Sequence, residues 1–426
     1  MSTETILVLG GSFAGISSAH FALKHIIPVL PKKDGITYNV TVVNPSKDFY
    51  WRIAGPRVAA SKELMPYNKL FYPIEPAFAY AKGKFNFVQG KATHVDSAGQ
   101  TVSVETASGE QKNIPYAALV IATGFSTPSP LFTQTTDRAA LEATYEAFHS
   151  QLKHAKTVVI GGAGPVAVEL AGELAEAVNG KPGFMASAPK NPKVKVTVIS
   201  AEKKMLPILR ESISKQAEKF LKRVGAEVVY NTKVVSATKA SDAEDAKMTV
   251  QLSDGKTIEA DIYIDATGTR PNTNFLPKEW LDNRNRVSCN AKTLRVEAAG
   301  PRVYVVGDCG SYTRGGVMDQ YDAIPVAMTN LRTDLIAHLS GQTPGPDRHY
   351  EANLKEQQLV PIGTSKGVGA ANGMALPSVM VWGIKGRDYM IGMLVEGHMN
   401  GKTYEKEGKW KPQPVVAAAQ MGTSRG

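Results

Sequence analysis

Residues 6–19 read ILVLGGSFAGISSA: a short apolar run meets two glycines, then a third glycine, then small residues that favour a helix. A glycine turn between a strand and a helix lets the backbone approach a pyrophosphate, and the N-terminus of the helix offers free N–H groups to it. The spacing is Gly10-x-Ser12-x-x-Gly15, with a serine where the pattern has its middle glycine. The stretch therefore predicts a dinucleotide-binding turn made of Gly10, Gly11, Ser12, Phe13, Ala14 and Gly15.

A similar stretch, VVIGGAGPVAVELAGELA, returns at residues 158–175, with the spacing Gly162-x-Gly164-x-x-Ala167. In both halves a strand leads through the glycine turn into a helix, a second strand and further alternating strands, and both halves close on Ala-Thr-Gly. One match to this pattern is weak, whereas two in the same context favour an internal duplication over glycines that only form tight turns or two unrelated units. The second turn and the two closing triplets add predicted nucleotide contacts at Gly162, Gly164, Pro165, Thr123, Gly124 and Gly268.

The second strand of such a unit usually ends in a carboxylate that binds the ribose 2′-hydroxyl and repels a 2′-phosphate. Asn44 holds that place in the first half, and its amide can still bind a hydroxyl. Ser200 holds it in the second half, with Lys203 close behind. Serine and lysine leave room for a 2′-phosphate, so the sequence favours NADPH, while Glu202 in the same loop keeps NADH open.

A third signal is RVYVVGDCG at residues 302–310, where an apolar strand ends in Gly307 and Asp308. An aspartate at such a strand end can accept hydrogen bonds from a ribityl chain, although alone it would fit an ordinary turn equally well. Residues 323–339 are predicted to form a helix, and Pro325 suits its first turn. The N-terminus of that helix is expected to face a flavin and to stabilise negative charge on the ring.

The composition restricts the class of protein. With 426 residues, of which 43% are apolar and 21% charged, two or three globular domains are expected. Two cysteines, and eight histidines without a recognisable cluster, predict neither a thiol-disulfide relay nor a metal site. The net charge of +10 comes from scattered lysines, which favours anionic cofactors over nucleic acid or anionic lipid. We expect a cytoplasmic protein because no long apolar run, signal sequence or N-myristoylation glycine is present.

Over about residues 1–345, these motifs together resemble the flavoproteins with two dinucleotide-binding domains of the glutathione-reductase fold. Disulfide reductases of that fold carry a redox cysteine pair after the first nucleotide unit, but residues 48–60, DFYWRIAGPRVAA, contain no cysteine. The stretches FYWRIAGPRV, VAVELAGELA and GIKGRDYMIGM are similar to the apoptosis-inducing factor 2 (ferroptosis suppressor protein) group and, more distantly, to type II NADH dehydrogenases. The resemblance implies FAD in the first domain, NAD(P)H in the second, hydride transfer to the flavin and reduction of a quinone-like acceptor.

The same resemblance implies roles for three further side chains. Glu169 matches a glutamate that faces nicotinamide and flavin; the alternative is a solvated helix residue, and Glu173, one turn on, is expected to be its exposed neighbour. Lys385 matches a lysine near the flavin; the alternative is a turn lysine between two strands. Arg57 is expected to approach the cofactor. Glu169 and Lys385 are therefore the predicted catalytic residues.

The predicted fold class is α/β, with two Rossmann-like domains that bind FAD and NAD(P)H and a C-terminal α+β segment. The FAD domain is predicted to comprise residues 1–125 and 262–345, the NAD(P)H domain residues 126–261, and the last segment residues 346–426. We also expect a surface insertion at 179–193, a linker at 340–349, alternating strands over 356–398 and a loose tail.

The predicted function is that of an FAD-dependent NAD(P)H oxidoreductase with a quinone-like acceptor. A redox-sensing flavoprotein and a tailoring oxidoreductase in a biosynthetic pathway are the alternatives. Peripheral membrane contact and a homodimer stay open.

Overall fold

The computed structural model describes residues 2–133, 137–183, 188–189, 191–241, 243 and 246–410. Its largest sheet has seven strands, in the order β18-β8-β1-β2-β5-β6-β7. The central pairs are parallel, and the apolar residues of β1 are buried on both faces, as expected for a parallel sheet covered by helices. The strands are β1 (Ser2–Leu9), β2 (Ile36–Asn44), β5 (Phe85–Asp96), β6 (Thr101–Thr106), β7 (Gln111–Pro115), β8 (Ala118–Ile121) and β18 (Val303–Val305).

The second sheet is parallel and has the order β12-β11-β10-β16. Because β16 pairs with β10, this sheet extends past residue 261, the predicted end of the second domain, and that predicted boundary lies at least one strand too early. The other predicted boundaries stay predictions. The strands are β10 (Thr157–Gly161), β11 (Lys195–Ile199), β12 (Ala226–Val229) and β16 (Ile262–Asp265), next to an antiparallel sheet of β13 (Val234–Lys239), β14 (Met248–Leu252) and β15 (Thr257–Ala260).

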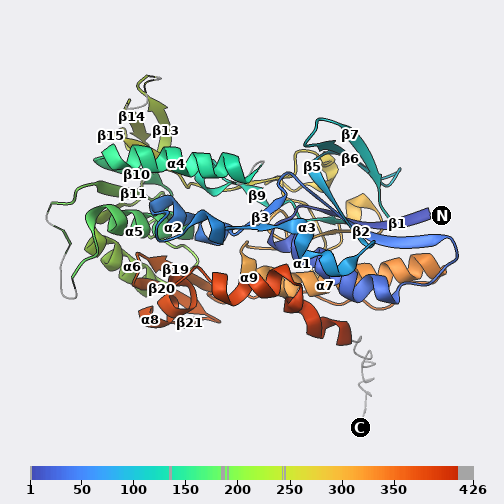
Figure 1. Cartoon of the computed structure of the whole chain (residues 1–426). Helices are drawn as coiled ribbons and strands as arrows, with labels where there is room; N and C mark the ends of the chain where they lie inside the picture. Colours follow the sequence, from blue (N-terminus) through green and yellow to red (C-terminus); the bar gives the residue numbers. More distant parts are fainter. Residues whose placement is uncertain are drawn as a thin grey trace, which may run out of the picture.

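Helices and short strand pairs connect the two sheets, which lie at opposite ends of the molecule (Figure 1). The α/β class with two Rossmann-like units is thus confirmed. The helices of this part are α1 (Phe13–Phe21), α2 (Gly55–Ala60), α3 (Ile74–Ala77), α4 (Arg138–His154), α5 (Pro165–Asn179) and α6 (Glu211–Val224), and the paired strands are β3 (Asp48–Tyr50) with β4 (Phe71–Pro73) and β9 (Phe125–Ser126) with β17 (Arg270–Pro271).

The C-terminal segment packs along both units (Figure 1), with β19 against α5 and α9 against α1. The prediction of alternating strands over 356–398 is correct only for its first half, because residues 378–399 are largely helical. Its elements are β19 (Gln358–Ile362), β20 (Lys366–Ala371), β21 (Met374–Ala375), α8 (Ser378–Val381), a π-helical turn (Trp382–Gly386) and α9 (Ile391–Met399).

The longest helix, α7 (Val317–Ser340), begins eight residues before Pro325. The prediction that Pro325 lies in the first turn is therefore wrong. Proline removes one intrahelical hydrogen bond and usually marks a helix start. Here Pro325 and its neighbours Ile324 and Val326 are buried in the core, and tertiary packing holds the helix through the proline.

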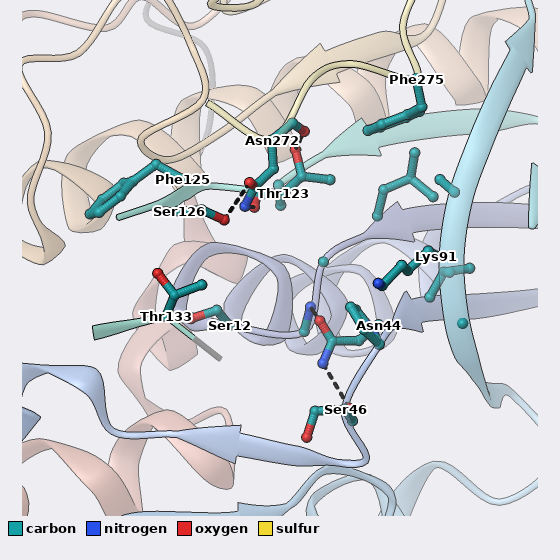
Figure 2. A pocket seen from close by; sticks show the side chains of 18 of the residues that line it. Ser12, Asn44, Ser46, Lys91, Thr123, Phe125, Ser126, Thr133, Asn272 and Phe275 are labelled. Carbon is teal, nitrogen blue, oxygen red and sulfur yellow. Dashed lines mark hydrogen bonds between the residues drawn. The ribbon is translucent and has the colours of Figure 1, made fainter. Parts of the chain in front are cut away.

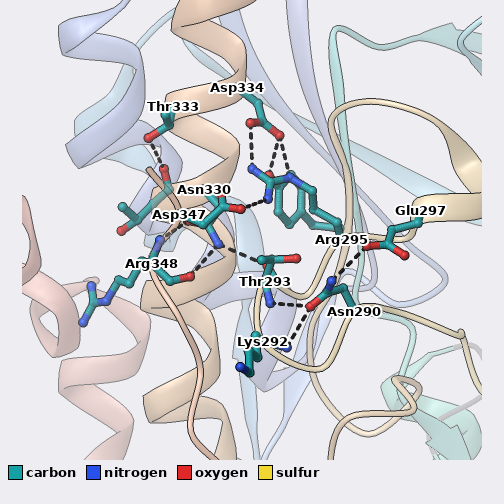
Figure 3. Close-up of polar contacts among 12 residues, drawn as sticks. Asn290, Lys292, Thr293, Arg295, Glu297, Asn330, Thr333, Asp334, Asp347 and Arg348 are labelled. Atoms are coloured by element: carbon teal, nitrogen blue, oxygen red, sulfur yellow. Dashed lines mark hydrogen bonds and ion pairs between the residues drawn. The ribbon is translucent and has the colours of Figure 1, made fainter. Parts of the chain in front are cut away.

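Polar contacts fix the chain that follows α7 (Figure 3). Arg295 binds Asp334 of α7 at 2.7 and 3.0 Å and Asp347 of the following segment at 2.7 Å. The Asn330 side chain accepts a hydrogen bond from the Arg348 amide at 2.7 Å and donates to the Arg348 carbonyl at 2.9 Å. The predicted linker is thus held against the first unit.

The base of the predicted insertion at 179–193 is closed by Asn179, whose amide binds both the N–H and the carbonyl of Val194 at 3.0 Å. The middle of the insertion and the tail from residue 411 lie outside the described residues. Among the helices that the structure describes, none combines the length and the apolar character needed to cross a membrane.

Candidate functional site

The first glycine turn joins β1 to α1 and requires glycine at two positions. Gly10 has a φ of +107°, and a Cβ there would lie 2.3 Å from the Ala122 carbonyl oxygen. A Cβ on Gly15 would lie 1.7 Å from the Gly10 carbonyl oxygen, so only glycine lets α1 approach the turn this closely. The Gly10 amide donates to the Val43 carbonyl at 2.8 Å. The turn is thus tied to both neighbouring strands.

The second glycine turn, between β10 and α5, repeats these contacts. Gly162 has a φ of +98°, and a Cβ there would lie 2.4 Å from the Ala266 carbonyl oxygen. Its amide donates to the Ile199 carbonyl at 2.8 Å. A Cβ on Gly164 would meet no atom within 4 Å, so this glycine leaves open space in front of the helix. The predicted duplication therefore holds at the level of single backbone contacts.

The N-terminus of α1 is left without a side-chain cap from the residue before the helix. Ser12 is the residue before the helix, and its hydroxyl makes no capping hydrogen bond. Asn44 instead braces the turn: its Oδ1 accepts from the Gly11 amide at 2.8 Å, and its Nδ2 donates to the Ser46 carbonyl at 2.7 Å. Unpaired N–H groups at a helix N-terminus, together with the helix dipole, form an anion site.

A cavity of about 470 Å³ opens in front of this turn (Figure 2). Ser12 and Asn44 lie on one side of it and Thr123, Asn272 and Phe275 on the other. It has a size typical of small-molecule and cofactor sites. Its walls are formed by Leu9, Gly10, Gly11, Ser12, Val43, Asn44, Pro45, Ser46, Tyr50, Arg52, Gly90, Lys91, Ala92, Ala122, Thr123, Phe125, Ser126, Thr133, Asn272, Asn274 and Phe275.

One wall of the cavity is held together by Asn272, a residue that carries no sequence motif. Its Nδ2 donates to the Thr123 carbonyl at 2.9 Å, its backbone carbonyl accepts from the Thr123 hydroxyl at 2.7 Å, and its Oδ1 accepts from the Ser126 hydroxyl at 2.7 Å. The Asn272 amide donates to the Gly124 carbonyl at 3.0 Å. The predicted residues Thr123 and Gly124 are therefore fixed by the chain that follows the second Ala-Thr-Gly.

Two oppositely charged residues interact beside this cavity. Arg52 lines it, donates to the Phe125 and Phe132 carbonyls at 3.3 and 2.8 Å, and stacks on the Phe125 ring. Asp308 follows β18 and accepts a hydrogen bond from the Gly316 amide, just before α7, at 2.9 Å. Burial raises the pKa of Asp308, and the Arg52 charge acts against that rise. Asp308 thus joins the end of β18 to the start of α7.

These features fit a flavin dinucleotide. The helix donors and Arg52 suit a pyrophosphate, Asn44 and Lys91 offer polar contacts, and apolar residues such as Phe275 complete the walls. Figure 2 shows Asn44, Lys91 and Phe275 around one space. The Phe13 side chain lies elsewhere: it is buried and packs on Phe49 and Trp51 at ring separations of 5.0 Å, so only its backbone faces the turn.

The two predicted catalytic residues meet away from this cavity. The Lys385 Nζ donates to Glu169 Oε1 at 2.5 Å and to the Leu359 carbonyl at 3.1 Å. Glu169 is 2% exposed, so it is not a solvated helix residue. Lys385 lies in the π-helical turn before α9 and not between two strands. Burial raises the pKa of Glu169 to about 7, although the Lys385 charge opposes the rise.

One further prediction is corrected beside this pair: Glu173, expected to be exposed, is 1% exposed. Arg57 binds Glu173 through two nitrogens, Nη2 to Oε1 at 2.7 Å and Nε to Oε2 at 3.0 Å, and its predicted approach to the cofactor stays a prediction. One turn further along α5, Glu176 accepts from the backbone amide of Thr364 at 3.0 Å. All three carboxylates of α5 thus face other parts of the chain and not solvent.

The residues predicted to select the nicotinamide cofactor do not act together. Ser200 is buried, and its hydroxyl and the Glu202 backbone bind one another within a turn. Lys204 donates to the Leu209 carbonyl, whereas Lys203 is exposed. The predicted contact Gly268 is exposed near the second turn. Of this set, the exposed side chains of Lys203 and Glu202 are the ones that can reach a ligand at the surface.

Several cavity residues were missed from sequence. Tyr50 and Arg52 belong to the stretch FYWRIAGPRV but carry no nucleotide pattern of their own. Asn272 lies four residues after the second closing triplet, and the matching segments after the two triplets pair as β9 and β17. The repeat of the closing triplets was thus the one sequence signal that could have pointed to Asn272. The buried stripe of Glu169, Glu173 and Glu176 has helical spacing, but spacing alone fits a solvated face equally well.

The fold and the two turns define a protein with two dinucleotide-binding units, one of which opens onto a large cavity. A family model described as pyridine nucleotide-disulphide oxidoreductase matches residues 4–330. The chain belongs to this family, whose members are FAD- and NAD(P)-dependent oxidoreductases. Its two cysteines are both free thiols: Cys309 is buried, and Cys289 lies beside Ser311.

Relatives and solved structures agree with the resemblance predicted from sequence. An oxidoreductase of Penicillium herquei, phnG, is 40% identical over 411 residues, covering 95% of this chain and 98% of its own length. Oxidoreductase ptaL of Pestalotiopsis fici is 32% identical, covering 88% and 94%. Ferroptosis suppressor protein 1 of Homo sapiens is 23% identical, covering 91% and 93%. NDH2 of Plasmodium falciparum, solved in complex with NADH, shares the fold with a TM-score of 0.64 at 15% identity, covering 96% of this chain and 99% of that chain.

Proposed function

We propose that this protein is an FAD-dependent NAD(P)H oxidoreductase that passes electrons to a quinone-like acceptor. The observation that carries the proposal is the ion pair between buried Glu169, on the helix that follows the second nucleotide turn, and Lys385 of the C-terminal segment. A redox cysteine pair is missing from the sequence, which argues against a disulfide acceptor.

The two glycine turns provide the binding part of this function. The α1 N-terminus and Arg52 would hold the FAD pyrophosphate, and Asn44 would meet a ribose. The open space at Gly164, before α5, would take the pyrophosphate of NAD(P)H. A bound flavin supplies the redox chemistry, because it can accept a hydride from a reduced nicotinamide and give electrons to a quinone.

The protein supplies proton chemistry through Glu169 and Lys385. Reduction of a quinone to a quinol by NAD(P)H consumes one proton beyond the transferred hydride. A carboxyl group whose pKa is about 7 can hold and release a proton near neutral pH, and Lys385 Nζ donates a hydrogen bond to this carboxyl group at 2.5 Å. Burial of Glu169 excludes water from the exchange. The family match, described as pyridine nucleotide-disulphide oxidoreductase, supports the nicotinamide part of the proposal.

The test is an anaerobic titration of the purified protein with NADPH and with NADH, followed by addition of a soluble benzoquinone. We expect a flavin absorbance that NAD(P)H bleaches and that the quinone restores rapidly. A preparation that contains no flavin, or whose flavin NAD(P)H does not bleach, would contradict the whole proposal. Bleaching without reoxidation by quinone would contradict the acceptor class alone.

A further inference from the structure

Three parts of the chain meet at one buried ion pair beside Glu169. Arg57 comes from α2, Glu173 from α5, and Tyr389 from the C-terminal segment just before α9. Arg57 binds Glu173 at 2.7 and 3.0 Å, and the Tyr389 hydroxyl donates to Glu173 Oε1 at 3.0 Å. All three side chains are at most 5% exposed. A buried charge pair with every partner satisfied is costly to break and fixes geometry.

The Tyr389 ring extends this cluster to Lys385. The Arg57 Cζ lies 4.7 Å and the Lys385 Nζ 5.8 Å from the centre of the ring. A cation near the face of a buried aromatic ring is stabilised by the electrostatic field of the ring. Tyr389 thus contacts the cation of the predicted catalytic pair with its ring and the neighbouring ion pair with its hydroxyl.

The backbone at this point is strained. Tyr389 has a φ of +54° and Met390 a φ of +66°, in the left-handed region that non-glycine residues seldom adopt. Such residues persist only where the surroundings over-determine them. Here the Tyr389 amide donates to the Lys385 carbonyl at 2.7 Å, and its carbonyl accepts from Trp51 Nε1 at 2.9 Å. The strained residue is therefore held at both backbone groups as well as by its side chain.

Trp51 also links this cluster to the cavity. It lies between Tyr50 and Arg52, which both line the cavity, whereas Trp51 itself is buried and faces Tyr389. The chain turns here from the end of β3 into a short 3-10 helix that begins at Arg52, so Trp51 contacts the cluster while its two neighbours line the cavity. A displacement of Tyr389 would therefore move Trp51 and, with it, the neighbouring residues that line the cavity.

We propose that Tyr389 and Glu173, together with Arg57, are positioning residues that hold Lys385 against Glu169 while this pair exchanges the proton consumed in acceptor reduction. The inference rests on the proposed function and deepens it. None of the three residues lines the cavity, and the role proposed for them is exerted through Lys385 and Glu169.

The charges around Glu169 predict that changes at Tyr389 and at Glu173 shift the pKa of Glu169 in opposite directions. Lys385 and Arg57 lower the pKa of Glu169, and Glu173 raises it. Burial raises the pKa of Tyr389 well above its ordinary value, so this residue stays a neutral phenol near neutral pH. Removal of the Tyr389 ring loosens Lys385 and should raise the pKa of Glu169, whereas loss of the Glu173 charge should lower it.

The experiment measures the rate at which benzoquinone reoxidises the NADPH-reduced holoenzyme, between pH 5 and pH 9. We expect the titration of this rate to move upward in pH by at least about half a unit in Tyr389→Leu, and downward by a similar amount in Glu173→Gln. Tyr389→Phe keeps the ring and should retain most of the wild-type profile. The rate of flavin reduction by NADPH should change less than twofold in all three, as expected for a step that does not consume this proton.

Tyr404→Phe is the matched control, because Tyr404 is another buried tyrosine of the C-terminal segment. Its pH profile should coincide with that of the wild type. Profiles of Tyr389→Leu and Glu173→Gln that coincide with wild type, or that move in the same direction, would overturn the inference. If Tyr389→Leu does not fold, the pH profiles of Glu173→Gln and Tyr389→Phe still test the inference, by the direction and the size of their shifts.

A wild-type holoenzyme that NADPH reduces but quinone does not reoxidise refutes the proposed acceptor, and that result appears before any variant is made.

Discussion

The Nζ atom of Lys385 lies 2.5 Å from Oε1 of Glu169, although the two residues are 216 positions apart in the chain. The contact joins the helix after the second nucleotide turn to the C-terminal segment. Because Glu169 is buried, its pKa rises to about 7 from the usual 4.5, even with the cation beside it. A proton bound this strongly in the folded state must affect stability as well as chemistry.

The first prediction concerns Glu169→Gln and the pH dependence of stability. A carboxyl group with a raised pKa in the folded state stabilises the fold fully below its unfolded pKa, and this stabilisation is lost as the pH rises through the folded pKa. Between pH 4.5 and pH 7 the wild type should therefore lose up to about 3 kcal/mol relative to Glu169→Gln, which does not titrate. Thermal unfolding measured at intervals across this range tests the expectation. The exposed Glu351→Gln serves as control, and a pH-independent difference between wild type and Glu169→Gln would contradict the prediction.

The second prediction separates folding from nucleotide binding at the second turn. Gly162→Ala should destabilise the protein by more than about 1–3 kcal/mol, because its φ is +98° and its Cβ would clash with the Ala266 carbonyl. Gly164→Ala should leave the melting temperature nearly unchanged, since its Cβ meets open space. That same methyl group should raise the KM for NADPH roughly tenfold by occupying the approach of the pyrophosphate. If Gly164→Ala leaves the KM for NADPH unchanged, the turn does not bind the nucleotide.

Local backbone requirements explain how much could be predicted from sequence. Gly10 and Gly162 follow apolar strands and precede helices, and no residue with a side chain fits at either position, so their pattern is visible in the sequence itself. The α/β class and the duplication follow from those two turns and the closing triplets. The family resemblance placed Glu169 and Lys385 together in function, and the structure brings them into contact.

The remaining errors share one cause, which is tertiary packing. Pro325 satisfies the rule for a helix start, but the core around α7 continues the helix in front of it. Glu173 has the spacing of a solvated residue, and only the approach of α2 and the C-terminal segment buries it. Asn272 carries no motif, because its partners Thr123 and Ser126 lie about 150 positions earlier in the chain. Such contacts cannot be read from periodicity.

The third prediction concerns Asn272 and flavin retention. Asn272→Ala removes the side-chain hydrogen bonds to the Thr123 carbonyl and the Ser126 hydroxyl, which leaves the Thr123 carbonyl without that donor in the cavity wall. We expect a loss of about 1–3 kcal/mol in stability and a purified protein with less bound flavin. Ser126→Ala removes one of these bonds and should have the smaller effect on both. Flavin absorbance per protein, with melting temperatures in the presence of added FAD, measures the two quantities. Equal flavin content in Asn272→Ala and the wild type would show that this wall is not part of the flavin site.

The last prediction concerns the choice between NADPH and NADH. Ser200 is buried in its own turn and Lys204 is bound to the Leu209 carbonyl, which leaves the exposed Lys203 as the cation of this loop that can meet a 2′-phosphate. Lys203→Ala should raise the KM for NADPH roughly three- to tenfold, the size of one charge-assisted contact, and leave the KM for NADH within about twofold. Steady-state quinone reduction with each nucleotide measures both constants. Lys219→Ala, an exposed lysine on α6, is the control and should change neither. A parallel rise for both nucleotides would assign Lys203 to the shared pyrophosphate, and no change in either would leave Glu202 and the backbone of the loop to set a preference for NADH.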